Sequence, residues 1–135
     1  MRHLLPVANV FGLLTIVFAM TMGVPLLDSL AQADGATDVY LESMLATLAG
    51  GGLLAAATWR HRRELHARDA FLLVSMVWVG LPAFATLPLL LWFAQAGTPL
   101  SFTDAYFETV SALTTTGSTV LTGLDALPSS VNFWR

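Results

Sequence analysis

The run Thr114-Thr115-Thr116-Gly117-Ser118-Thr119 is the part of this sequence whose residue types best suit binding of an ion. Five of its six residues carry a hydroxyl group and none is charged. Three consecutive β-branched residues favour an extended backbone over a helix, and Gly117 permits backbone angles that other residues resist. Successive carbonyl oxygens of an extended segment can replace the hydration shell of a cation such as K⁺. On composition alone, a polar loop between two helices is an equally good interpretation.

Other kinds of chemistry find little support in these residues. All six basic residues are Arg and there is no Cys, so this chain supplies no P-loop or Schiff-base lysine, no catalytic thiol and no Cys-zinc site. His61, Glu64 and His66 do not have the spacing of known zinc-binding helices, and a solvated loop is the better prediction there. No catalytic triad, phosphate-binding glycine loop or basic tract for nucleic acid is present. The sequence therefore predicts neither an enzyme nor a nucleic-acid-binding protein.

The composition is that of a membrane protein. Of the 135 residues, 56% are hydrophobic and 11% are charged, whereas soluble domains carry about 25% charged residues. The mean hydropathy is +0.69 and the formal net charge is -3. These values argue against a soluble domain and against disorder, and the length allows one domain at most.

Three apolar segments are long enough to cross a membrane, at residues 4–27, about 40–59, and 70–96. As a helix the first would be about 36 Å long, compared with about 30 Å for the hydrocarbon core of a bilayer. In the second, Gly50, Gly51 and Gly52 predict close packing of a neighbouring helix. A cleaved signal peptide is the alternative for the first segment, but its apolar stretch is longer than is usual for such peptides.

Charges between these segments predict an orientation. The link at residues 60–69 holds Arg60, Arg62, Arg63 and Arg68, and the link at residues 28–42 holds Asp28, Asp34, Asp38 and Glu42 without any Arg. Cytoplasmic loops are enriched in basic residues. We therefore expect residues 60–69 and the N-terminus, with Arg2, in the cytoplasm, and residues 28–42 outside.

The segment after the third span differs in kind. Residues 102–113 would form a helix only about 18 Å long, which is too short to span a membrane. Ser101 and Asp104 form a loose capping box at its start, where Asp104 suits the helix dipole and faces outer water. Glu108 lies one turn deeper and needs a partner or water, so a structural role behind residues 114–119 and an electrostatic role are equally favoured. Residues 120–128 are predicted to form an outer loop, and residues 129–135 open another helix.

This order places non-helical backbone at membrane depth, where it is tolerated only inside protein or beside a water-filled cavity. Three stretches closely resemble the first pore loop of bacterial Trk-type potassium uptake proteins, the TrkH and TrkG subunits of a superfamily that includes KtrB and the plant HKT transporters. They are Thr103-Asp104-Ala105-Tyr106-Phe107-Glu108, Ser111-Ala112-Leu113-Thr114-Thr115-Thr116-Gly117-Ser118-Thr119 and Gly123-Leu124-Asp125-Ala126-Leu127-Pro128. The two preceding helices resemble the extra N-terminal pair of TrkH, so the resemblance covers essentially the whole chain.

The resemblance implies an all-α integral membrane protein, with two N-terminal transmembrane helices followed by a helix–pore loop–helix repeat whose second helix is truncated. Residues 1–66 would hold the helix pair and residues 67–135 the first pore repeat. Within that repeat we expect a transmembrane helix at 69–97, a pore helix at 101–113, a selectivity filter at 114–119 and the next helix from 129 to 135. The family pore has four such repeats in one chain, so the chain is interpreted as the N-terminal quarter to third of a longer protein.

By the same resemblance, K⁺ would bind the carbonyl oxygens of Thr115, Thr116 and Gly117, with Thr114 and Ser118 as neighbours. Ser118 stands where Ala is also common in the family. The implied partners are K⁺, the lipid bilayer, a second copy of the full-length chain and a cytoplasmic nucleotide-binding subunit of the TrkA type. The implied location is the bacterial inner membrane, with several spans. K⁺ is the transported ion, and no organic cofactor is expected.

Two other functions compete with a K⁺ pore. One is a small membrane assembly protein without a transport role. The other is a fragment of an intramembrane enzyme that uses Asp104 or Glu108 as acid or base, although no nucleophile or metal ligands accompany these residues. For a K⁺ pore, coupling to H⁺, coupling to Na⁺ and channel-like passage all stay open.

Overall fold

The computed structural model describes residues 4–61 and 65–135, which are largely helical. The elements are α1 (Leu4–Thr21), α2 (Gly23–Gln32), α3 (Thr37–Thr58), the 3-10 turn η1 (Trp59–His61), α4 (Ala67–Gln95), α5 (Phe102–Leu113), the 3-10 turn η2 (Leu124–Ala126) and α6 (Ser129–Trp134). No strand occurs among the described residues. The residues Arg2, Arg62, Arg63 and Glu64, used above for orientation and for the rejected zinc site, lie outside the described part. The chain is an all-α integral membrane protein, as the sequence predicts.

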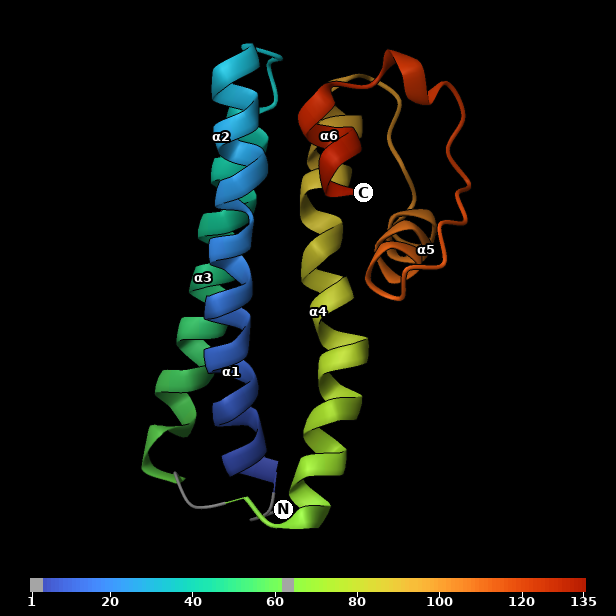
Figure 1. The fold of residues 1–135 in the computed structure, drawn as a ribbon. Coiled ribbons are helices and arrows are strands. Elements are labelled where there is room, and N and C mark those ends of the chain that lie inside the picture. The colour runs from blue at the N-terminus through green and yellow to red at the C-terminus, as the bar shows by residue number, and fades with distance from the viewer. Residues whose placement is uncertain (1–3, 62–64) are drawn as a thin grey trace.

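Within the described part, three helical segments are long and apolar enough to cross a membrane, and they are Leu4–Gln32, Thr37–His61 and Ala67–Gln95. Helices α1 and α2 form one column, with α3 and α4 alongside it (Figure 1). The predicted link at residues 28–42 is much shorter than expected, because Asp28 lies in α2 while Asp38 and Glu42 lie in α3. Acidic residues near a helix end can reach water, and Asp38 in the first turn of α3 also suits the helix dipole.

Helices α1 and α3 are in close backbone contact at a pair of glycines, Gly12 and Gly51. A Cβ atom on Gly51 would lie 2.9 Å from the carbonyl oxygen of Gly12, and a Cβ on Gly12 would lie 2.8 Å from the backbone nitrogen of Ala55. The expected close packing at the glycine run is therefore present at Gly51. At Gly50 a Cβ would meet only the ring of Phe84, at 3.0 Å, and at Gly52 it would meet nothing within 4 Å. Small residues allow such contact where apolar side chains gain little by leaving lipid.

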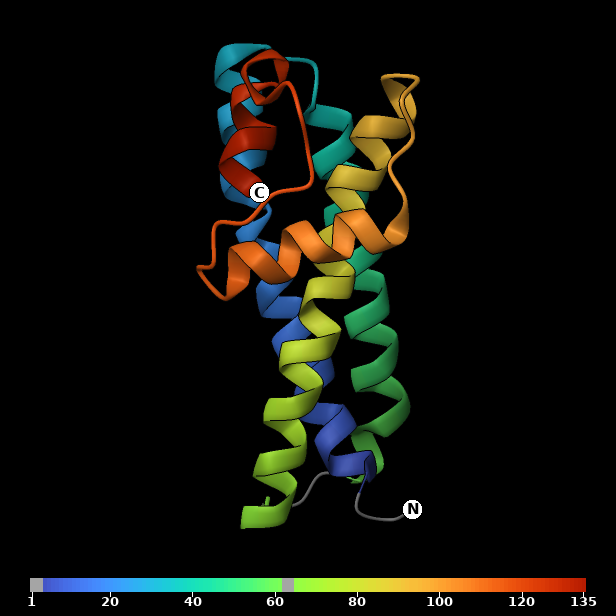
Figure 2. The same ribbon diagram turned by 90° about the vertical axis from the view of Figure 1, so that its right-hand side faces the viewer.

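Helix α4 carries two prolines, Pro82 and Pro88, inside its length. Figure 2 shows α5 lying across this helix. Carbonyl oxygens spaced three residues apart along α4 accept side-chain hydrogen bonds from the later helices. Their donors are Tyr106 to Val79 at 3.0 Å, Thr109 to Pro82 at 3.1 Å, and Trp134 to Ala85 at 3.0 Å. These bonds attach α5 and α6 to the third span while satisfying polar groups that have little access to water.

The short connection between α2 and α3 holds the start of α6. The carboxylate of Asp34 accepts hydrogen bonds from the backbone N–H of Ser130 at 3.2 Å and from its hydroxyl at 2.6 Å. The other carboxylate oxygen accepts from the Ser29 hydroxyl and the Ala36 N–H. Tyr40 donates its hydroxyl to the Ser130 carbonyl at 2.9 Å. Burial raises the pKa of Asp34, but these hydrogen bonds outweigh burial and hold that pKa below its usual range.

We expect Asp34→Asn to lower the free energy of unfolding by about 1–2 kcal/mol at neutral pH, because an amide accepts fewer and weaker hydrogen bonds than a carboxylate. A lowered folded-state pKa means that the stabilisation is present above the unfolded pKa and is lost as pH falls through the folded pKa. The difference in melting temperature between wild type and variant should therefore shrink as the pH is lowered below about 4. An equal difference at neutral and acidic pH would contradict this role of the Asp34 charge.

Candidate functional site

The segment predicted to bind K⁺, residues 114–119, follows α5 directly and is exposed along its length. We call it the pore segment. At the other end of α5, Ser101 accepts a hydrogen bond from the Asp104 N–H at 3.1 Å and donates its hydroxyl to the Asp104 carboxylate at 2.7 Å. Asp104 thus belongs to the helix start, where a negative charge is favourable.

A tight turn ends α5 and opens the pore segment. The N–H of Thr116 bonds to the Ser111 carbonyl at 2.9 Å and the N–H of Thr115 to the Ala112 carbonyl at 3.0 Å, the two bonds of a Schellman motif. Thr115 occupies its left-handed position with φ +55°, which costs a β-branched residue roughly 1–2 kcal/mol. The expected extended backbone is therefore wrong at Thr115, because hydrogen bonds that close the helix outweigh its conformational preference.

Beyond the turn, the backbone has no regular secondary structure from Thr116 to Gly123. The carbonyl oxygen of Ser118 accepts the Ser111 hydroxyl at 2.7 Å. The carbonyl oxygens of Thr115, Thr116 and Gly117 accept no hydrogen bond from any described residue. Gly117 has φ +72°, so a second left-handed residue lies within this short stretch. These three carbonyl groups are the ones predicted to face the ion, and K⁺ binding by them stays a prediction.

Glu108 lies behind the pore segment and is 2% exposed. One carboxylate oxygen accepts the Thr119 hydroxyl at 2.6 Å and the Val120 N–H at 2.7 Å. The other lies 3.3 Å from a guanidinium nitrogen of Arg135, which also donates to the Thr119 hydroxyl at 3.0 Å. Of the two roles left open by the sequence, this geometry favours the structural one, because the charge is buried and paired. Sequence reasoning missed Arg135, since nothing local signals a partner 27 residues away.

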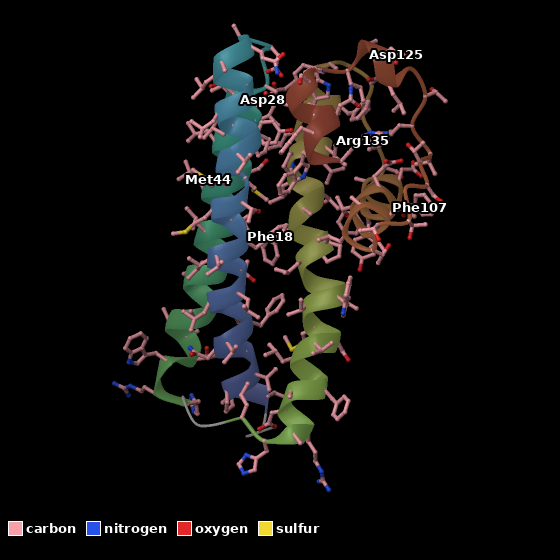
Figure 3. The ribbon with its side chains drawn as sticks, viewed as in Figure 1. Phe18, Asp28, Met44, Phe107, Asp125 and Arg135 are labelled. Carbon is pink, nitrogen blue, oxygen red and sulfur yellow. The ribbon has the colours of Figure 1, made fainter. Side chains whose placement is uncertain are left out.

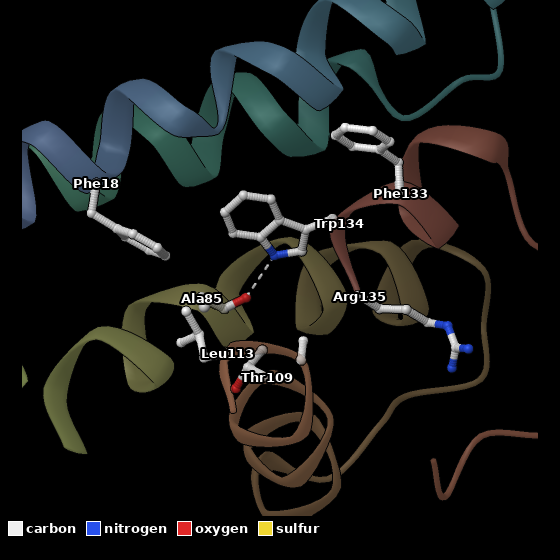
Figure 4. A pocket seen from close by; sticks show the side chains of 8 residues that line it. Phe18, Ala85, Thr109, Leu113, Phe133, Trp134 and Arg135 are labelled. Atoms are coloured by element: carbon white, nitrogen blue, oxygen red, sulfur yellow. Dashed lines mark hydrogen bonds between the residues drawn. The ribbon is translucent and has the colours of Figure 1, made fainter. Parts of the chain in front are cut away.

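A cavity of about 310 Å³ is lined by residues of α1, α4, α5 and α6. Its lining includes Phe18 of α1, Ala85 of α4, Thr109 of α5 and Trp134 of α6 (Figure 4). The ring centroids of Phe18 and Trp134 are 5.9 Å apart, so α1 contacts the end of α6 through these two rings. In Figure 3, Phe18 lies on α1 below the level of α6, and Arg135 lies beside α6. The described residues hold no group of three or more His, Cys, Asp or Glu suited to a metal ion.

Comparison with known proteins decides the family. The TrkH family profile, described as "Cation transport protein", matches residues 36–135. The chain belongs to the TrkH family. The match begins in the connection before α3 and includes α4, α5, the pore segment and α6.

Individual TrkH relatives match over nearly the whole chain. The Trk system potassium uptake protein TrkH of Halomonas elongata is 41% identical over 129 residues, which are 96% of this chain and 26% of that protein. TrkH of Escherichia coli K12 is 38% identical over 133 residues, 98% of this chain and 27% of that protein. The crystal structure of the potassium transporter TrkH from Vibrio parahaemolyticus superposes with a TM-score of 0.87 at 38% identity, over 98% of this chain and 28% of that chain. The chain thus spans about a quarter of the length of these relatives.

Proposed function

We propose that this chain forms the first repeat of a K⁺-selective pore and that the pore segment contributes one wall of its selectivity filter. One observation carries the proposal. The carbonyl oxygens of Thr115, Thr116 and Gly117 accept no hydrogen bond from the described residues, and they directly follow α5, a helix too short to span a membrane. Carbonyl oxygens can replace the hydration shell of K⁺. The relatives named potassium uptake proteins support K⁺ as the ion.

The proposal extends to the organisation of the protein. Residues 1–66 would supply a helix pair and residues 67–135 the first pore repeat, with further repeats completing the ring of carbonyl oxygens around the ion. The complete protein would lie in the bacterial inner membrane with its N-terminus in the cytoplasm. It would act as a homodimer with a TrkA-type nucleotide-binding subunit. The supporting observation for orientation is the contrast between the arginines at residues 60–69 and the acids at residues 28–42.

The competing functions fit the site less well. An intramembrane acid or base needs access to substrate, whereas the Glu108 carboxylate is buried and bound by Thr119, Val120 and Arg135. A membrane assembly role explains neither the carbonyl oxygens of residues 115–117 that accept no hydrogen bond from the described residues nor the left-handed backbone of Thr115. Backbone strain of this kind clusters at functional sites.

The test is uptake by the complete protein that contains this chain, expressed in cells lacking other K⁺ uptake systems. We expect it to restore growth at low K⁺ and to take up Rb⁺, with K⁺ competing far better than Na⁺. Expression in the membrane without growth or Rb⁺ uptake, with the regulatory subunit present, would favour the assembly-protein alternative.

A further inference from the structure

Different sets of hydrogen bonds hold the two ends of the pore segment. The Schellman motif of α5 holds the N-terminal end. The Ser111–Ser118 bond and the Glu108 carboxylate hold the C-terminal end, the latter through Thr119 and Val120. The carbonyl groups of Thr115, Thr116 and Gly117 lie between these attachments, so a shift at either end changes where they point.

We infer that Glu108 and Arg135 form a positioning pair that holds the C-terminal end of the pore segment and thereby sets its discrimination between K⁺ and Na⁺. The inference rests on the proposed function. Neither residue needs to touch the ion; both act through Thr119 and Val120, the residues they bind at the end of the segment.

The hydrogen-bond pattern around Glu108 suits a carboxylate that acts only as an acceptor. Every bond that Glu108 makes to the pore segment and to Arg135 is accepted by the carboxylate and none is donated, which is the pattern of a deprotonated acid. A buried carboxylate is costly unless a cation compensates it, and Arg135 supplies that cation. Bonds to charged groups are also the stronger ones. The pair therefore gives a stiffer attachment than neutral groups would.

The same burial argues against cation attraction as the purpose of Glu108. Its side chain is 3% exposed and lies next to a guanidinium group, so the field that it adds at the mouth of a pore is largely cancelled. Asp104, on the same helix and nearer its start, is the less buried acid and serves as the matched control for an effect of charge alone.

The pair also attaches the pore segment to α6. That helix is held at its start by Asp34 and near its end by the bond from Trp134 to Ala85. Arg135 follows directly after Trp134, so its guanidinium group is presented to Glu108 from a helix with fixed position. A movement of α6 would pull on Thr119 through Arg135 and Glu108.

The experiment compares Glu108→Gln, Arg135→Gln, the double variant and Asp104→Asn in the complete protein, at matched abundance in the membrane. The readouts are the KM for Rb⁺ uptake and the inhibition constant for Na⁺. We expect each single change at the pair to reduce the ratio of the Na⁺ constant to the Rb⁺ KM by about tenfold. The double variant should lose no more than either single one, because the two residues act as a unit. Asp104→Asn should leave the ratio unchanged.

Unchanged selectivity in both single variants, or additive losses in the double variant, would overturn the positioning pair. If Glu108→Gln does not reach the membrane, Thr119→Val tests the inference instead, because it removes the hydroxyl that both residues bind and leaves both charges. Unaltered selectivity in that variant equally overturns the inference.

Gly117→Ser separates failure of the positioning role from failure of the proposed function. If Gly117→Ser alters selectivity and the pair variants do not, only the positioning role falls; if none does, residues 114–119 are not the filter.

Discussion

Gly117→Ser in the complete protein is expected to leave folding and insertion intact and to weaken the preference for K⁺ over Na⁺ by about tenfold. Gly117 has φ +72°, and a Cβ there would meet nothing within 4 Å. The change therefore causes no clash within the described residues, but it places a non-glycine residue in the left-handed region at a cost of roughly 1–2 kcal/mol. Relief of that strain would rotate the peptide groups on either side, and with them the carbonyl oxygens of Thr116 and Gly117.

The measurement is Rb⁺ uptake with and without competing Na⁺, together with growth at low K⁺. Gly52→Ser is the matched control, because Gly52 lies in α3 where a Cβ meets nothing within 4 Å and the backbone is helical. Gly12 is unsuitable for this purpose, because its Cβ would lie 2.8 Å from backbone atoms of α3. Normal Na⁺ competition in Gly117→Ser at equal abundance would refute the assignment of the filter to this segment.

Gly51→Leu is expected to destabilise the N-terminal helix pair and to lower the melting temperature of the protein. A Cβ on Gly51 would lie 2.9 Å from the Gly12 carbonyl oxygen and 3.1 Å from the backbone nitrogen of Ile16. These neighbours are backbone atoms of α1, so only separation of the two helices makes room. Overpacking of this kind costs typically 1–3 kcal/mol and can cost more when backbone has to move.

The measurement is the melting temperature and yield of purified protein in detergent. Gly52→Leu adds the same side chain one position away, where it meets no neighbouring group within 4 Å of its Cβ, and it should behave as wild type. Equal melting temperatures for Gly51→Leu and Gly52→Leu would show that the α1–α3 contact is looser than the structure indicates. If Gly51→Leu lowers the melting temperature and yield while Gly52→Leu does not, the N-terminal helix pair is needed to hold α4 and the pore segment.

Much of the architecture follows from local sequence signals. Long apolar runs predict the three spans, and the short run after Ser101 predicts a helix that cannot cross the membrane. The boundaries were less accurate, as the link expected at residues 28–42 shows, because α2 and α3 continue through their acidic residues. The turn at Thr115 was missed for a related reason. A β-branched residue disfavours the left-handed conformation locally. At Thr115 this conformation becomes favourable only because the N–H groups of Thr115 and Thr116 then bond to the last carbonyl oxygens of α5.

By itself, the sequence determined that this chain is a helical membrane protein. It also predicts an orientation from its charges and ion binding by the carbonyl oxygens of Thr115, Thr116 and Gly117. Those properties depend on composition and on neighbours along the chain. Only the tertiary structure decided that Glu108 is paired with Arg135 and that Asp34 holds Ser130, partners 27 and 96 residues apart. Several acids and hydroxyls of this chain were chemically suited to each of these bonds. The choice among them depends on how α1, α3, α4 and α6 pack, because a buried polar group bonds to whatever the packing brings within about 3 Å.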